Sequence, residues 1–218
     1  MKKKKTVCYF LMYLPLVVAL IALPYLPEKI PAHYGFDNQV DRWGSKYESL
    51  VFPIISLLMG YFLLGMAKLA GKKEEHGENN KNVTIILGIL VLVLFNALSI
   101  YSLYTSFNRV DNLSSISLDI AQLAFCIIGV LMIITGNLMP KLRMNSTIGL
   151  RTHWSMKNET TWKKCQHIGG ISFIIGGIII IGICIAMKGT PCLLSVLGVW
   201  AILIVVDVFL TYKIAKRN

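Results

Sequence analysis

Few residues of this chain have the types and spacing that chemistry requires. His33 lies close in sequence to Asp37 and Asp41, and a histidine with two carboxylates could hold a metal ion. The spacing of these three residues, however, matches neither a zinc-ligand pattern nor a calcium-binding loop. We therefore expect no metal site and no cofactor.

Nucleophilic catalysis is not indicated either. An enzyme needs a nucleophile with its base, a carboxylate pair or a metal cluster placed in a pocket. The five cysteines form no C-x-x-C pair, and no serine stands in a recognisable nucleophile motif. The sequence predicts that the protein is not an enzyme.

The elements that must position the polar residues are apolar. The 218 residues are 55% hydrophobic, and the mean hydropathy is +0.63, which exceeds that of an ordinary soluble domain. A membrane span needs about 20 mostly apolar residues. The chain is thus predicted to be an all-α membrane protein, a polytopic bundle of six transmembrane helices in a lipid bilayer. The predicted spans lie near residues 7–26, 50–69, 83–107, 117–138, 168–187 and 192–212.

The spans pair into three predicted units. Residues 1–70 form a first hairpin of spans around an outside loop at 27–48, residues 71–138 form a second, and residues 139–218 combine a polar cytoplasmic loop with a third. Lys and Arg concentrate in the cytoplasmic loops of membrane proteins. If both termini are inside, 17 of the 22 Lys and Arg lie on the cytoplasmic side. The net charge of +11 therefore indicates an N-in, C-in topology and not direct nucleic-acid binding.

The outside loop offers aromatic rings among mixed charges. Gly35, Asn38 and Gly44 are turn residues, so we expect a compact loop there and no helix. Aromatic anchors ringed by charges suit the recognition of a peptide, and they equally suit a loop that folds over the helix ends. The residues that would bind a peptide are His33, Tyr34, Asp37, Asp41, Arg42 and Trp43.

The longest polar stretch, residues 139–167, has six Lys and Arg against one acid. Its charge suits a loop against anionic lipid heads. Pro140 is expected to stop the preceding helix, Gly149 to allow an unusual backbone conformation, and Asn158 to cap a new helix. Trp154 and Trp162 are rings that could lie at the interface or bind a partner.

One acid is predicted inside a span. An ionised aspartate at the bilayer centre costs about 2.5–3.5 kcal/mol, so Asp207 should have a partner or remain protonated. We expect an intramembrane clamp between Asp207 and Lys68, with Arg143 or Arg151 as other partners for Asp207, and keep a proton or ion relay as the alternative.

Two motifs resemble those of a known family. The run M-P-K-x-R-x-N-x-x-I-G-x-R-T-x-W, followed by x-E-x-x-W and the pair Gly169 and Gly170, resembles the signature of the SdpI family of bacterial membrane proteins. The outside pattern I-P-x-H with D-x-x-V-D-R-W-G-S-K resembles a second motif of that family, with Asn38 where Gly is common. Asn also tolerates a left-handed backbone, so we expect the turn to persist.

The resemblance implies a multi-pass protein of the bacterial cell membrane with one of two roles. The first is immunity against a secreted toxic peptide, which would meet the outside loop. The second is signalling, in which the inside loop holds a small repressor protein at the membrane. The inside-loop residues that would hold either the repressor or the structure of the loop itself are Pro140, Arg143, Asn145, Gly149, Arg151, Trp154 and Trp162. Transport of a small solute or ion remains the alternative function.

Overall fold

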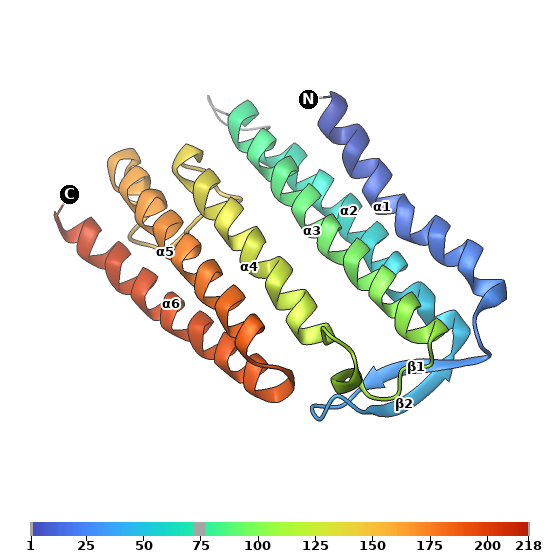
Figure 1. The fold of residues 1–218 in the computed structure, drawn as a ribbon. Coiled ribbons are helices and arrows are strands. Elements are labelled where there is room, and N and C mark those ends of the chain that lie inside the picture. The colour runs from blue at the N-terminus through green and yellow to red at the C-terminus, as the bar shows by residue number, and fades with distance from the viewer. Residues whose placement is uncertain (1, 72–76, 218) are drawn as a thin grey trace.

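The structure, a computed structural model, describes residues 2–71 and 77–217. Six long helices lie side by side, and a β-hairpin lies at one end of them (Figure 1). The elements are α1 (Lys2–Ala22), β1 (Lys29–Tyr34), β2 (Val40–Ser45), α2 (Val51–Ala70), α3 (Gly77–Phe107), α4 (Ile120–Leu138), α5 (Glu159–Ala186) and α6 (Gly189–Arg217). Short 3₁₀ turns cover Leu23–Tyr25, Lys46–Leu50, Leu113–Ser115 and Met139–Lys141.

The prediction of six membrane spans is confirmed. Each of the six helices is long and apolar enough to cross a membrane. A helix rises about 1.5 Å per residue, so about 20 residues match the hydrocarbon core of a bilayer. The apolar side chains that point away from the bundle are therefore the surface that lipid covers.

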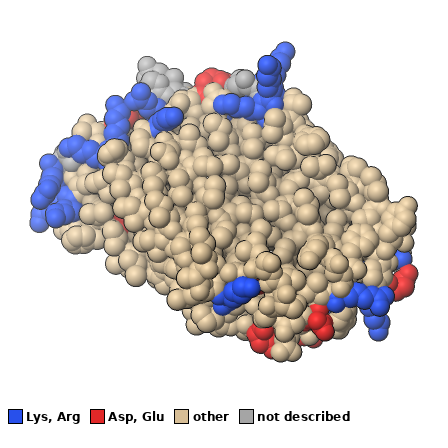
Figure 2. All heavy atoms as spheres, in the orientation of Figure 1, with Lys and Arg blue, Asp and Glu red and all other residues tan. Residues whose placement is uncertain are grey.

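The two ends of the bundle differ in charge. We call the end with the starts of α1, α3 and α5 the basic end, and the opposite one the hairpin end. On the face seen in Figure 2, Lys and Arg gather at the basic end, whereas at the hairpin end they are mixed with Asp and Glu. This asymmetry is the feature from which the N-in, C-in topology is predicted.

The helices pack in two groups of three. In the first group, Met12 of α1 packs against Ala67 of α2 and Ile85 of α3. In the second group, Ile180 of α5 packs with Met132 of α4 and Val196 of α6. The groups meet where α3 packs against α4. Residues on α2 and α6 are consequently separated by the helices between them (Figure 1).

Glycines bring α4 and α5 close together. A Cβ atom added to Gly170 would lie 2.5 Å from the carbonyl oxygen of Gly136, and one added to Gly177 would lie 2.5 Å from that of Gly129. No side chain larger than hydrogen fits at such distances. The glycine-rich sequence of the fifth span therefore serves close helix packing, as small residues do in membrane helices.

The outside loop holds a β-hairpin in addition to the expected turns. β1 and β2 pair antiparallel, with Pro31 opposite Trp43 and His33 opposite Arg42. The pairing is irregular on both sides of His33, which twists the two-stranded ribbon. The loop is thus a defined platform across the hairpin end of the bundle (Figure 1).

Candidate functional sites at the two ends of the bundle

The turn of the hairpin is tied to the connection between α3 and α4. Asn38 has a φ of 65°, so the left-handed turn predicted for this asparagine is confirmed. Its carbonyl accepts a hydrogen bond from the Leu113 amide at 2.8 Å, and the Val40 amide donates to the Asp111 carbonyl at 2.9 Å. These bonds hold the ribbon against the bundle.

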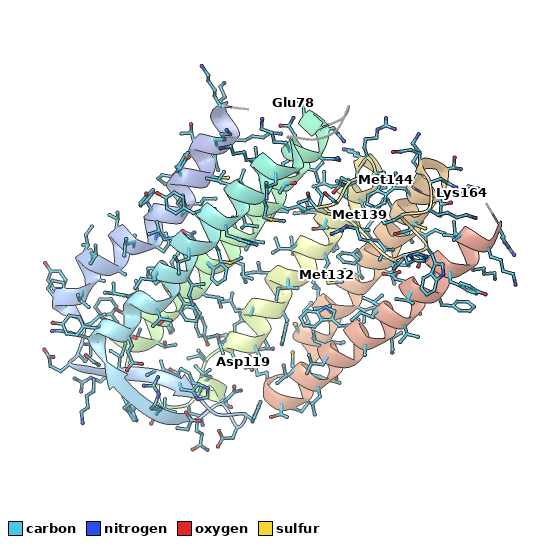
Figure 3. The ribbon with its side chains drawn as sticks, turned by 180° about the vertical axis from the view of Figure 1, so that it is seen from behind. Glu78, Asp119, Met132, Met139, Met144 and Lys164 are labelled. Atoms are coloured by element: carbon cyan, nitrogen blue, oxygen red, sulfur yellow. The ribbon has the colours of Figure 1, made fainter. Side chains whose placement is uncertain are left out.

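Asp119 is the polar centre of the hairpin end (Figure 3). Its side chain is fully buried and caps α4, where Oδ1 accepts from the Gln122 amide at 2.8 Å. Oδ2 accepts from the side-chain amide of Asn38 at 3.1 Å and from the Gly189 amide at 2.8 Å. One carboxylate therefore joins the hairpin, the start of α4 and the turn between α5 and α6.

Gln122 extends this network across the second helix group. Its Oε1 accepts from the Asp119 amide at 3.1 Å, which completes a capping box. Its Nε2 donates to the carbonyls of Cys184 at 2.7 Å and Met187 at 3.1 Å. The last turn of α5 is thereby linked to the first turn of α4.

The hairpin end presents large aromatic rings on its surface. Phe36 is 76% exposed, Trp43 is 45% exposed, and Tyr47, which follows β2, is 62% exposed. Aromatic side chains with one wet and one apolar side are suited to a membrane interface and to binding another chain. The hydrogen-bonded backbone of the hairpin fixes the positions from which Phe36 and Trp43 project.

Two pairs of ionisable side chains contact each other on the same surface. Arg42 donates two hydrogen bonds to the carboxylate of Glu48, at 3.1 and 2.8 Å. The Nδ1 atom of His33 lies 2.7 Å from Oδ1 of Asp41. Both pairs are partly exposed, so they orient the side chains more than they stabilise the fold.

Two of the predicted peptide-binding residues have local roles. Tyr34 points inward and donates its hydroxyl to the Val110 carbonyl at 2.8 Å. Burial, with the nearby Asp111 carboxylate, raises the pKa of Tyr34, so the phenol remains a donor. Asp37 is exposed and accepts from the Gln39 amide at 3.1 Å, which shapes the turn.

At the basic end, residues 139–158 fold into a cap over the helix termini. α4 stops at Leu138, one residue before the turn that contains Pro140, as predicted. Trp162 of α5 is fully buried and donates its Nε1 hydrogen to the Leu142 carbonyl at 2.9 Å. Met139 and Met144 belong to the same apolar cluster and lie near each other in Figure 3.

The middle of the cap is fixed by Gln166. Its amide group donates to the Leu150 carbonyl at 3.0 Å and accepts from the Leu150 amide at 3.0 Å. Gly149 has a φ of 106°, and a Cβ atom there would lie 2.7 Å from Oε1 of Gln166. The predicted need for glycine at this position is thus confirmed, for a steric reason as well as a conformational one.

Asparagines tie the cap to itself and to α3. Oδ1 of Asn145 accepts from the amides of Thr147 and Ile148, both at 2.8 Å, and its Nδ2 donates to the Arg143 carbonyl at 2.7 Å. Oδ1 of Asn80 in α3 accepts from the Arg143 amide at 3.1 Å. The cap therefore links the two helix groups at this end.

The cap also contacts α6 through three side chains. Thr152 and Thr211 share a hydrogen bond between their Oγ1 atoms at 3.1 Å. Trp154 packs edge-to-face on Tyr212, with 5.5 Å between ring centroids. Lys157 donates to the Ala215 carbonyl at 3.1 Å, near the end of α6 where a cation is favourable.

The predicted inside-loop residues thus separate into two sets. Trp162 and Asn145 are buried, and Arg143 and Trp154 are half-buried, so these four hold the cap together. Pro140, Gly149 and Arg151 are exposed, and Lys163 is exposed on the first turns of α5 beside them. Only the exposed set is available to a partner.

The predicted clamp between Asp207 and Lys68 does not form. Asp207 is buried on α6, and Lys68 lies on α2 in the other helix group. Among the residues that the structure describes, no ion pair joins Asp207 to Lys68, Arg143 or Arg151, and Oδ1 of Asp207 has no hydrogen-bond partner. The prediction paired Lys68 with Asp207 because both lie at a similar depth in their spans. Depth in a span carries no information about which helices are neighbours.

Within residues 2–71 and 77–217, no group of three or more His, Cys, Asp or Glu is placed to hold a metal ion.

Sequence reasoning missed the residues that make each end rigid. Asp119 stands three residues before Gln122 in the pattern D-x-x-Q, which is a capping-box signal that could have marked the start of α4. Asn80 and Gln166 carry no local signal, because their partners are remote in the chain.

Both ends of the bundle include segments that match models of known protein families. Residues 141–211 match the model of the SdpI/YfhL protein family, and residues 10–57 match a domain of unknown function (DUF1648). The chain is 25% identical over 178 residues to the Bacillus subtilis (strain 168) protein named Immunity protein SdpI. The aligned region covers 82% of this chain and 80% of that protein. No solved structure matches. The hairpin lies inside one matched segment and most of the cap inside the other.

Proposed function

We propose that this chain, a multi-pass cell-membrane protein of the SdpI family, is an immunity protein that protects the cell from a secreted, membrane-active peptide toxin. The similarity to a named immunity protein over most of the chain is the observation that carries the proposal. The resemblance recognised from the residues supports the same family.

The hairpin end is the part of the molecule that would meet the toxin. A membrane-active peptide has apolar and charged side chains and must pass the membrane interface to act. Phe36 and Trp43 offer exposed rings to its apolar side chains, and Arg42 and Asp41 offer charges of both signs. In this proposal the N-in, C-in topology places the hairpin outside the cell, where a secreted peptide arrives.

Rigidity of the platform supports binding in preference to a passive surface loop. Ordering a flexible loop on binding would lower affinity, because each immobilised side chain costs about 0.5–1.5 kcal/mol. The Asn38 side chain donates to Asp119 and its carbonyl accepts from the Leu113 amide, so the backbone of the turn is ordered before a peptide arrives. A peptide would then bind a surface that already has its final shape.

A gain-of-function assay tests the immunity role. The chain is expressed in a bacterial strain that is sensitive to a panel of purified, secreted, membrane-active peptides, and its presence in the membrane is verified. We expect survival to rise for at least one peptide relative to the same strain with an empty vector. An unprotected strain with correctly inserted protein, for every peptide of the panel, would contradict the immunity role.

The second candidate function is the recruitment of a small repressor protein at the basic end. It is favoured by two exposed cations, Arg151 on the cap that the buried residues hold rigid and Lys163 on the first turns of α5. An acidic protein surface would complement them. This role needs the same topology, since a repressor acts in the cytoplasm.

Paired variants separate a docking role of the cap from a folding role. Arg151→Ala removes an exposed cation, whereas Trp154→Ala removes the ring that packs on Tyr212. If the cap docks a repressor, Arg151→Ala abolishes its recruitment to membranes while the amount of folded protein stays normal. Normal recruitment by Arg151→Ala and by a matched Lys163→Ala variant would rule out docking through these cations.

A further inference from the structure

A cavity between the first three helices is not explained by either proposed role. Its volume is about 510 Å³, which lies in the range of about 300–1,000 Å³ typical of small-ligand sites. It is at the basic end, near the start of α1, the end of α2 and the start of α3. Its lining includes Lys5, Lys68, Lys81, Tyr9, Tyr61 and Gly65.

All the charged residues that the structure describes in the cavity lining are lysines. Each of the three helices contributes one lysine, and no Asp or Glu is among the described residues that line the cavity. Lys81 is bound to Glu78, with 3.0 Å between Nζ and Oε1. Lys5 and Lys68 form no ion pair with any other residue that the structure describes. Within the described part of the chain, two cations without a carboxylate partner therefore line one cavity.

The position of the lysines along the helices matches the depth of lipid headgroups. Lys5 lies near the start of α1 and Lys68 near the end of α2, where lysines extend from a span toward the interface. Tyr9, one turn after Lys5, lines the same cavity, and tyrosines favour this level of the membrane. Tyr61 also lines the cavity but lies midway along α2, deeper in the span.

The cavity is also open toward the side that lipid covers. Gly65 is exposed, and a Cβ atom added to it would have no heavy atom within 4 Å. Tyr61 and Phe62 beside it are exposed on the same helix. A ligand with an anionic head and apolar chains could thus enter from the bilayer, with its chains remaining in lipid.

We propose that this cavity binds the phosphodiester headgroup of an anionic phospholipid, with Lys5 and Lys68 as the residues that contact the phosphate. Basic pockets between membrane helices are suited to such headgroups. Lys68 then has a ligand as its counter-charge in place of the aspartate expected from sequence. The proposal does not depend on the immunity role, since it concerns a different part of the molecule.

A thermal-shift titration tests the site. The protein is purified in a neutral detergent, freed of bound lipid and heated with phosphatidylglycerol, with phosphatidylcholine of the same acyl chains, or with inorganic phosphate. We expect only phosphatidylglycerol to raise the melting temperature. An equal rise with phosphatidylcholine would overturn recognition of the headgroup, and an equal rise with inorganic phosphate would show that a free anion is the ligand.

Charge variants identify the residues responsible. Lys5→Gln and Lys68→Gln should each weaken the apparent affinity for phosphatidylglycerol about 5-fold, which is the typical contribution of one basic residue near a headgroup. Lys213→Gln is the matched control, because Lys213 is exposed at the same end but on α6, and it should leave the affinity unchanged. An equal loss in Lys213→Gln would show a general charge effect and overturn the site.

A size variant tests the cavity itself without removing charge. Gly65→Leu places a side chain in the open space, whereas Gly198→Leu adds the same side chain to α6, also with no heavy atom within 4 Å of the new Cβ. Gly65→Leu should abolish the phosphatidylglycerol-specific rise, and Gly198→Leu should retain it. Retention of the full rise by Gly65→Leu would show that the lipid binds elsewhere.

Discussion

At the scale of single residues, the buried carboxylate of Asp119 has the widest structural effect. It accepts hydrogen bonds from Asn38, Gln122 and Gly189, which belong to three separate parts of the chain. Hydrogen bonds to an ionised acceptor are stronger than those between neutral groups. This side chain therefore adds to the backbone bonds that position the hairpin on the helices.

Replacing Asp119 by Ala should destabilise the protein by about 3 kcal/mol or more. The variant leaves three donors at a buried site without their acceptor, and each such group costs about 1–3 kcal/mol. The amount of monodisperse protein that survives heating in detergent measures this loss.

Asp37→Ala is the control for that experiment. Asp37 is exposed and accepts one hydrogen bond within its own turn, so its removal should cost less than about 1 kcal/mol. If Asp119→Ala and Asp37→Ala lost monodisperse protein at the same temperature, the stabilising role of the Asp119 hydrogen bonds would be contradicted.

Local rules explain which single residues could be predicted. The left-handed turn at Asn38 and the cap at Asn158 follow from side chains that bond their own neighbourhood, and both are confirmed. The bonds of Gln166 to Leu150 and of Asn80 to Arg143 join distant positions, so no pattern in the sequence reveals them. The same limit made the pairing of Lys68 with Asp207 wrong.

At the scale of elements, the contact between α4 and α5 depends on having no side chain at two glycine pairs. Lipid chains are as apolar as leucine, so helices in a membrane associate through close packing and not through the hydrophobic effect. Gly136 with Gly170, and Gly129 with Gly177, bring the two backbones to that distance.

Gly136→Ala should therefore destabilise the second helix group by about 1–3 kcal/mol, the usual cost of overpacking. The new methyl group would overlap the Gly170 carbonyl oxygen, which cannot move without shifting α5. Unfolding in increasing denaturing detergent measures the change.

Gly182→Ala on α5 provides the comparison. A Cβ atom there meets no heavy atom within 4 Å, so this variant should be neutral or slightly more stable. If Gly136→Ala were as stable as Gly182→Ala, the contact between α4 and α5 would not depend on the close approach of their backbones.

The helices were predictable and the hairpin was not, for a physical reason. A span is set by the thickness of the bilayer, so a long apolar run is a strong signal. β1 and β2 are short strands whose exposed residues do not alternate with buried ones, and β2 has no buried residue. Proline and glycine in that segment indicated turns. The hairpin also bonds to the segment from Val110 to Leu113, and a contact between such distant parts of the chain leaves no local pattern in the sequence.

At the scale of the whole molecule, the account depends on the orientation in the membrane. The predicted topology places the hairpin outside and the cap inside, and both proposed partners require it. Asp37 is exposed on the hairpin and Lys163 is exposed beside the cap, so each can report its side.

Cysteine labelling should reveal this orientation. Asp37→Cys should react with a membrane-impermeant maleimide in intact cells, and Lys163→Cys should react only after the cells are opened. The parent chain is the background control, since four of its five cysteines are buried. Labelling of Lys163→Cys in intact cells would reverse the topology and contradict both proposed functions.

The most direct test of the central claim is the survival of a sensitive strain that expresses hairpin variants during challenge with a peptide from which the parent chain protects. The double variant Phe36→Ser with Trp43→Ala removes two exposed rings from the hairpin, and Phe209→Ala removes a ring from α6 whose exposure lies between theirs. If the hairpin meets the toxin, the double variant should lower the tolerated peptide concentration by about 10-fold or more, while Phe209→Ala keeps full protection. Full protection by a correctly inserted double variant would contradict the claim that these rings carry immunity.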